Sequence, residues 1–424
     1  MNGLRRALIG CVFVLLMAAG LVVWMNIDTS PAVADGPPEN TPASVERGRY
    51  LALIGHCAGC HTAPGGAAYA GGQGITTPFG TLRPGNLTPD MTHGLGGWTV
   101  AQFARALRAG RSADGRLLYP AFPYEHFSLL TDADVRALYD YFQSLPAAAQ
   151  ANVSHDLSWP YNTQAALAVW RALFFRPKAW TQDAQQSPAW NRGAYLVQAV
   201  AHCGACHTPR NALGASVDAQ ALGGGVMMSG RWLAPSLRDP QQAGVQSWTD
   251  LSASQILRSG ASPQGSVMGP MASVVMGSLQ HLRDDDAAAM ATYLRSLPRT
   301  TLAQAPAQAQ VNRSATAAQM QSGEHLYKLH CKGCHGAQGE GQAQAYAALA
   351  GSRKVLMPNP ANLVQVVWWG GFGPSTPGQP RPYGMPPFVQ LLSNSEVADV
   401  ITYVRQSWGN AAEVVSAADV QRLR

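Results

Sequence analysis

The feature that most constrains this chain is a short cysteine–histidine motif that occurs three times. Each copy reads Cys-X-X-Cys-His, and the copies begin at Cys57, Cys203 and Cys331. Two thiols followed directly by an imidazole are typical of covalent attachment of haem c, in which both cysteines bind the porphyrin and the histidine is the proximal iron ligand. We therefore predict three covalently bound haem c groups. The predicted attachment residues are Cys57, Cys60, Cys203, Cys206, Cys331 and Cys334, and the predicted proximal ligands are His61, His207 and His335.

Two other uses of paired cysteines fit the motif poorly. A zinc site would bring two cysteine pairs within about 15–20 residues of each other. Here more than 100 residues separate successive pairs, and every pair carries its own histidine. A thioredoxin-like redox pair would be single and would lie in a strand–helix–strand pattern. Repetition of the complete motif favours haem attachment.

Length and charge agree with a multidomain haem protein better than with a nucleic-acid-binding protein. At 424 residues the expectation is about three domains, one for each motif. The formal net charge is +6, but three haems would bring six propionates, and the basic residues are scattered along the chain. We therefore expect no nucleic-acid partner. Outside the haem motifs no nucleophile or acid–base cluster is evident.

The N-terminal residues 1–34 are predicted to be a membrane anchor or a signal sequence. The run from Ala7 to Met25 carries no charge, is long enough to cross the hydrocarbon layer, and follows Arg5 and Arg6. The segment 32–34 resembles a signal-peptidase cleavage site, but the apolar run is longer than usual for a signal peptide and favours a retained anchor. This predicts an inner (cytoplasmic) membrane protein whose haem domains face the periplasm.

The chain also contains a longer repeat around each motif. Arg47-Gly48-Arg49-Tyr50-Leu51, Arg192-Gly193-Ala194-Tyr195-Leu196 and, more loosely, Ser322-Gly323-Glu324-His325-Leu326 each lead into a motif with helical periodicity. Closing helices are predicted at 134–145, 284–297 and 395–408, and prolines follow the first two. The arrangement resembles the all-α class I cytochrome c fold. The predicted organisation is three tandem cytochrome c domains at 45–148, 189–298 and 318–412, here named the first, second and third repeats.

Two linkers separate the repeats. The linker 299–317 is rich in Ala, Gln and Ser and is predicted to be a flexible spacer. The linker 149–188 is aromatic and contains an amphipathic run from Thr163 to Phe175. We expect this run to form a helix packed between the first two domains; a docking or membrane-surface element is the alternative.

A second axial ligand is expected on the opposite face of each haem, usually methionine or histidine. Met385 and Met271 lie in proline-bearing loops before the closing helices of the third and second repeats, with Met268 and Met276 as rivals of Met271. The corresponding slot of the first repeat holds Phe122, which cannot bind iron. The predicted distal ligands are Met271, Met385 and, in the first repeat, His126, with Met91 and His93 as its rivals.

These residues resemble the triple-haem cytochrome c subunits of membrane-bound periplasmic dehydrogenases that oxidise alcohols, aldehydes or sugar acids. The likeness covers nearly the whole chain after Glu46, including Asn86-Leu87-Thr88-Pro89-Asp90 and Leu118-Tyr119-Pro120-Ala121. In related cytochromes a proline carbonyl accepts a hydrogen bond from the proximal histidine, and the resemblance places Pro84, Pro235 and Pro358 in this slot. The alcohol and gluconate branches hold methionine where this chain has Phe122. That departure, with His126, is closest to the branch that serves molybdopterin iron–sulfur enzymes of the aldehyde dehydrogenase and nicotinate or isoquinoline oxidoreductase type.

The resemblance implies a non-catalytic electron-transfer subunit. It would relay electrons from a catalytic dehydrogenase subunit, with a possible small iron–sulfur subunit, through three haems to ubiquinone or a terminal oxidase. The alternatives are the cytochrome subunit of a quinoprotein alcohol dehydrogenase or flavoprotein gluconate dehydrogenase, a free periplasmic electron shuttle, and a multihaem peroxidase that uses a vacant iron in the first repeat.

Overall fold

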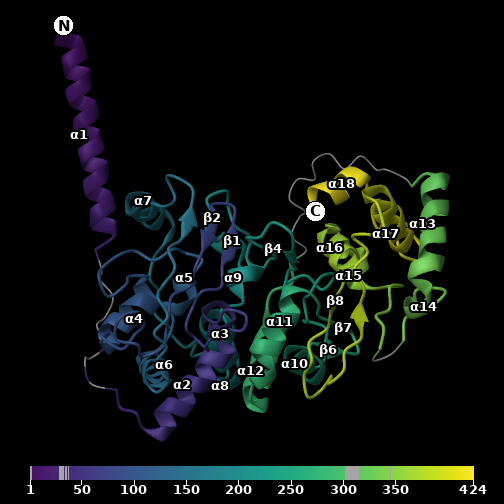
Figure 1. The fold of residues 1–424 in the computed structure, drawn as a ribbon, viewed down its shortest axis with the longest axis horizontal. Helices are drawn as coiled ribbons and strands as arrows, with labels where there is room; N and C mark the ends of the chain where they lie inside the picture. Colours follow the sequence, from purple (N-terminus) through teal and green to yellow (C-terminus); the bar gives the residue numbers. More distant parts are fainter. Residues whose placement is uncertain (1, 28–32, 34–35, 37, 301–314, 343–344) are drawn as a thin grey trace. The chain divides into compact units, whose positions relative to one another are not determined.

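The computed structural model describes residues 2–27, 33, 36, 38–300, 315–342 and 345–424. Their regular secondary structure is mainly helical (Figure 1), and the chain divides into two compact units. Unit 1 comprises Met1–Ala52, Cys60–Thr181 and Asn211–Ala215, and unit 2 comprises Leu53–Gly59, Gln182–Arg210 and Ser216–Arg424. Most of the predicted spacer 299–317 and of the predicted cleavage site 32–34 lies outside the described residues.

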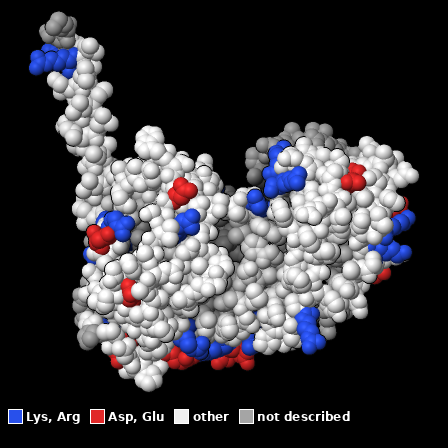
Figure 2. Space-filling model, in the orientation of Figure 1, with Lys and Arg blue, Asp and Glu red and all other residues white. Residues whose placement is uncertain are grey.

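Helix α1 (Asn2–Met25) is the apolar N-terminal helix expected from the sequence. Its span Gly3–Met25 is long and apolar enough to cross a membrane, and its large apolar side chains are exposed. Figure 2 shows α1 without charge apart from a basic group near its beginning, which corresponds to Arg5 and Arg6. The helix therefore has the composition of a membrane anchor.

The first repeat and the linker after it are built from short helices and one small sheet. Their elements are α2 (Pro42–Ile54), α3 (Cys57–His61), β1 (Ile75–Thr77), β2 (Gly80–Leu82), α4 (Val100–Ala109), α5 (Tyr124–Phe127), α6 (Asp132–Gln143), β3 (Asp156–Leu157) and α7 (Gln164–Phe174).

The second repeat has the same order of an opening helix, an attachment turn, loops and a closing helix. Its elements are α8 (Pro188–Tyr195), η1 (Leu196–Val200), α9 (Gly204–His207), η2 (Asp218–Gln220), β4 (Gly225–Val226), β5 (Leu233–Ala234), α10 (Asp250–Ser259), β6 (Ala261–Ser262), β7 (Gly265–Ser266), α11 (Pro270–Gly277), η3 (Leu279–His281) and α12 (Asp284–Ser296).

The third repeat encloses an apolar core around Trp368 and Tyr327. Its elements, with the C-terminal helix, are α13 (Ala317–His330), α14 (Lys332–His335), α15 (Arg353–Leu356), α16 (Ala361–Trp369), β8 (Gly371–Phe372), β9 (Gly384–Met385), α17 (Asn394–Gln406) and α18 (Ala417–Arg422).

A glycine at the same place in each repeat lets the opening helix cross the closing helix closely. An added Cβ atom would meet a backbone carbonyl oxygen of the closing helix in every case, well inside van der Waals contact. This explains the glycine of the repeated sequence before each motif. The distances from such a Cβ are 1.8 Å at Gly48 to Ala137, 1.9 Å at Gly193 to Ala289 and 2.3 Å at Gly323 to Asp399.

A polar contact ties the same two helices together. In the first two repeats the arginine before the glycine pairs with a buried aspartate of the closing helix. Arg47 Nε donates to Asp134 over 2.7 Å, and Arg192 binds Asp286 through two hydrogen bonds of 2.7 and 2.9 Å. The third repeat replaces the arginine by Ser322, whose hydroxyl donates to Asp399.

Short antiparallel strands depart from the all-α prediction. They pair as β1-β2-β3, β4-β5, β6-β7 and β8-β9, with two or three residues each. The loops between helices reverse direction within a few residues: residues 78–79 join β1 to β2, which begins at Gly80 with φ 124°. The fold is therefore helical with small hairpins in its loops.

The linker helix α7 confirms the amphipathic run predicted at 163–175. Thr163 caps it, and within unit 1 it packs against the end of α1. Asn26 donates its side-chain amide to the carbonyl of Ala168, and the Arg171 guanidinium lies over the rings of Tyr124 and Phe175. Two exposed apolar residues, Val169 and Leu173, lie on the same helix.

Candidate haem-attachment sites

Each Cys-X-X-Cys-His motif folds into one short helical turn. The turns are α3, α9 and α14, and in the last two the backbone N–H of the histidine donates to the carbonyl of the first cysteine, four residues earlier. None of the seven cysteines, all of which lie in the described residues, forms a disulfide. Among the described residues no group of three or more His, Cys, Asp or Glu side chains could hold a metal ion.

The proximal histidines are held by backbone carbonyl oxygens. His207 Nδ1 lies 2.7 Å from the Pro235 oxygen, which confirms the predicted acceptor. His61 Nδ1 instead lies 2.7 Å from the oxygen of Gly85, because the Pro84 carbonyl accepts from the backbone of Gly72. The prediction of Pro84 was wrong by one residue.

In the third repeat the prediction of Pro358 was also wrong. His335 Nδ1 lies 2.8 Å from the oxygen of Ala347, which comes only twelve residues after the histidine. The first two repeats place a β-hairpin between the histidine and its acceptor, whereas the described residues of this shorter loop contain no strand. The acceptor consequently comes earlier in the chain than the resemblance indicated.

These hydrogen bonds, together with burial, favour a protonation state in which the imidazoles can bind iron. Burial lowers the pKa of His61 and of His207, which favours the neutral ring. A neutral ring whose Nδ1–H donates to a carbonyl leaves the Nε2 lone pair available as a metal ligand. The carbonyl also fixes the orientation of the ring.

A single cavity of about 1280 Å³ lies within unit 2 and reaches the attachment turns of both the second and the third repeat. Its lining includes His207, Met271, His335 and Met385, so four predicted iron ligands face one space. Sites for one small molecule usually measure about 300–1,000 Å³. The larger volume and the mostly apolar lining fit two porphyrins.

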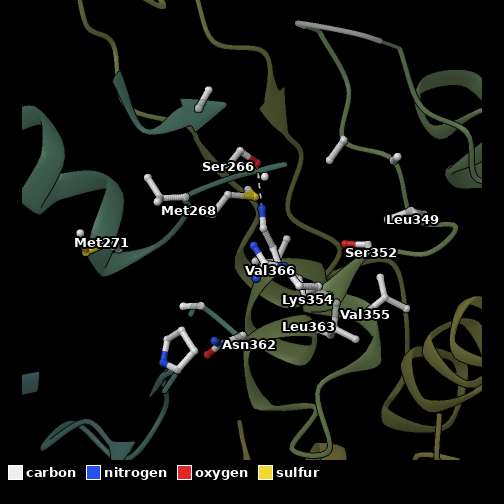
Figure 3. A pocket seen from close by; sticks show the side chains of 18 of the residues that line it. Ser266, Met268, Met271, Leu349, Ser352, Lys354, Val355, Asn362, Leu363 and Val366 are labelled. Carbon is white, nitrogen blue, oxygen red and sulfur yellow. Dashed lines mark hydrogen bonds between the residues drawn. The ribbon is translucent and has the colours of Figure 1, made fainter. Parts of the chain in front are cut away.

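The lining of the cavity separates the three methionines of the second repeat that are candidates for the distal ligand. Figure 3 shows Met268 in the loop before α11 and Met271 near the beginning of that helix, and both line the cavity. Met276 lies further along α11, is 48% exposed and does not line it. Met271 and Met268 therefore both stay candidates for the distal ligand of the second repeat, whereas Met276 does not line the cavity.

In the first repeat the slot residue Phe122 belongs to an aromatic cluster. Its ring packs against Phe127 and Tyr124, with centroids 5.5 and 6.4 Å apart. His126 is half-buried on α5, the helix that also carries the buried Tyr124 and Phe127, whereas Met91 is 74% exposed. This arrangement favours His126 over Met91 as the distal ligand.

The sequence did not reveal that the residues just before the first motif contact the second repeat within unit 2. Within unit 2, His202 Nε2 lies 3.1 Å from the carbonyl oxygen of Gly55, and the hydroxyl of Ser278 donates to that of Ile54. A Cβ atom on Gly277 would lie 2.7 Å from the ring of His56. His56 and His202, which directly precede the first cysteines of the first two motifs, therefore take part in contacts within unit 2. No local signal could have revealed these contacts, because the partners are more than 100 residues apart.

Comparison with known proteins agrees with this geometry. The cytochrome c family matches residues 45–146, 191–298 and 320–408. The alcohol dehydrogenase (quinone), cytochrome c subunit, of Komagataeibacter europaeus is 40% identical over 91% of this chain and 85% of its own length. The gluconate 2-dehydrogenase cytochrome c subunit of Pantoea cypripedii is 38% identical over 96% and 95%. A nicotinate dehydrogenase subunit of Pseudomonas putida is 38% identical over 92% of this chain but only 32% of its own length.

Proposed function

Because the chain belongs to the cytochrome c family, we propose that it is the electron-transfer subunit of a membrane-bound dehydrogenase complex and carries three covalently attached haem c groups. The observation that carries the proposal is the shared cavity, in which proximal histidines and distal methionines of two repeats face one space. The first repeat supplies the third site.

Different residues of each repeat would bind the porphyrin and the iron of its haem. In each repeat the two cysteines would hold the haem through thioether bonds, and the histidine of the motif would be a ligand of its iron. Met271 and Met385 would supply the second iron ligands in the second and third repeats, with Met268 as the rival of Met271, and His126 would do so in the first. Bound haem supplies one-electron transfer between ferrous and ferric iron. The carbonyls of Gly85, Pro235 and Ala347 keep the proximal rings in place.

The electron donor is the catalytic subunit of a dehydrogenase. Phe122 and His126 favour a molybdopterin enzyme with an iron–sulfur subunit, because two imidazoles favour ferric iron and give a lower potential that suits an iron–sulfur donor. The 40% identity to a subunit of quinone alcohol dehydrogenase supports a second candidate, a quinoprotein or flavoprotein partner. Ubiquinone or a terminal oxidase accepts the electrons.

Helix α1 supports a location at the inner membrane. Its uncharged span follows Arg5 and Arg6, which keep the N-terminus cytoplasmic and the haem domains in the periplasm. The contact of α7 with the end of α1 holds unit 1 close to the point where the anchor ends.

Extraction of the native complex in mild detergent tests the proposal. We expect three haems per chain, a co-purifying large subunit, and reduction of the haems by the substrate of that subunit only when it is present. The isolated chain should cycle between oxidised and reduced spectra without oxidising any substrate. Turnover of an alcohol, aldehyde or peroxide by the isolated chain would refute it.

A further inference from the structure

A lysine lies inside the cavity that the second and third repeats share. Lys354, the second residue of α15, lines this cavity together with the proximal histidines of both repeats. Its ammonium group donates to Ser266 Oγ on β7 over 2.8 Å, as the dashed line in Figure 3 shows. The side chain thus extends from the third repeat to the second.

Within the described part of the chain, no carboxylate forms an ion pair with Lys354. The acidic residue that lines the cavity, Glu340, accepts from the backbone N–H groups of Ala337 and Gln338 instead. The surrounding protein lowers the pKa of Lys354 to about 8 by desolvation. A desolvated ammonium whose acceptor is a single hydroxyl is costly, and an anion beside it would offset that cost.

The neighbouring cation has its own partners. Arg353 donates to the carbonyl oxygens of Pro240 and Gly244 at 2.9 and 3.0 Å, and its guanidinium lies over the ring of Trp248. These contacts join the third repeat to the second, and they engage the guanidinium of Arg353 in hydrogen bonds to the backbone and in stacking on an aromatic ring. Lys354 is therefore the better candidate for binding an anion inside the cavity.

Resting on the proposed function, we propose that Lys354 binds a propionate of a haem held in this cavity and raises the reduction potential of that haem. Each porphyrin brings two carboxylates, and this ammonium faces the space that two porphyrins would fill. A fixed positive charge near iron favours the ferrous state, which carries one positive charge less than the ferric state. The propionate belongs to the haem of either the second or the third repeat, and the experiment distinguishes them.

The test is a redox titration of the full-length chain in detergent, followed optically, for four variants. Lys354→Met should lower one of the three midpoint potentials by an amount equivalent to at least a tenfold change in the reduction equilibrium, about 59 mV for one electron. Lys354→Arg should keep most of the potential because it keeps the charge. Ser266→Ala should have little effect, and Lys328→Met, which removes an exposed charge outside the cavity, should have none.

Repeating Lys354→Met in the Met271→His and Met385→His backgrounds identifies the haem whose propionate Lys354 binds. Each background first shifts the potential of one known haem, so the further shift caused by Lys354→Met can be assigned to that haem or to the other. If Lys354→Met does not mature, Lys354→Gln, which keeps a donor to Ser266, serves for the same measurement. A variant that carries three haems with unchanged potentials overturns the inference and leaves the proposed function intact. Absence of covalent haem from the wild-type chain would overturn both.

Discussion

The first and third repeats differ in the residues that occupy the position predicted for the distal haem ligand. The third repeat presents Met385 to a cavity, whereas the first fills the corresponding slot with Phe122 inside an aromatic cluster and presents His126 from α5. Their opening and closing helices nevertheless cross at equivalent glycines. The comparison teaches that the close crossing of the opening and closing helices is common to both repeats, while the residues at the position predicted for the distal ligand differ.

The largest expected effect comes from removing an attachment site. Replacing Cys331 and Cys334 by alanine should reduce the covalent haem content from three to two per chain, because thioether bonds retain haem through denaturation. The alkaline pyridine spectrum of the denatured chain measures this. The same change at Cys57 and Cys60 is the matched comparison, and three haems in either variant would contradict the assignment.

The variant His126→Ala tests whether His126 is the distal ligand of the first haem. All three haems should stay attached, one should become high-spin or water-ligated, and the other two should stay low-spin. Electron paramagnetic resonance of the oxidised chain reports this, with Met385→Ala as the counterpart in the third repeat. Adding Phe122→Met to His126→Ala should restore a low-spin haem with a higher potential, because thioether ligation favours the ferrous state. An unchanged spectrum in His126→Ala would instead point to Met91, His93 or a ligand supplied by a partner.

Replacing the glycine at which the opening and closing helices cross should destabilise the first and the third repeat by similar amounts. Gly48→Ala and Gly323→Ala each place a Cβ atom within 2.3 Å of a carbonyl oxygen, and overpacking of this kind costs about 3 kcal/mol of unfolding free energy. Urea unfolding followed in the Soret band measures the change. Gly97→Ala, whose nearest neighbour would be 3.9 Å away, is the control and should be nearly neutral. A neutral Gly48→Ala would show that the close crossing does not contribute to stability.

Much of the helical arrangement was predictable because it depends on local sequence. The closing helices predicted at 134–145, 284–297 and 395–408 agree within two residues with α6, α12 and α17, since capping residues and apolar periodicity mark them. The acceptors Gly85 and Ala347 were missed because loop length and competing hydrogen bonds decide which carbonyl reaches the imidazole. The shared cavity and Lys354 were missed because they arise from packing between repeats.

The smallest expected effect concerns the polar tie between opening and closing helices. Arg47→Ala leaves the buried carboxylate of Asp134 without its cation, but Arg47 is half-exposed, so the cost should be about 1–2 kcal/mol. Ser322→Ala removes one hydrogen bond to Asp399 and should cost about 1 kcal/mol or less. Urea unfolding of both variants compares them, and a larger loss for Ser322→Ala would reverse the expected order.

Near-infrared magnetic circular dichroism of the fully oxidised chain tests the central claim most directly, because the energy of its charge-transfer band distinguishes imidazole–imidazole from imidazole–thioether ligation of ferric haem. We expect one haem with two imidazoles, from His61 and His126, and two haems with imidazole and methionine. Three methionine-ligated haems, or a first haem that is high-spin, would contradict the account.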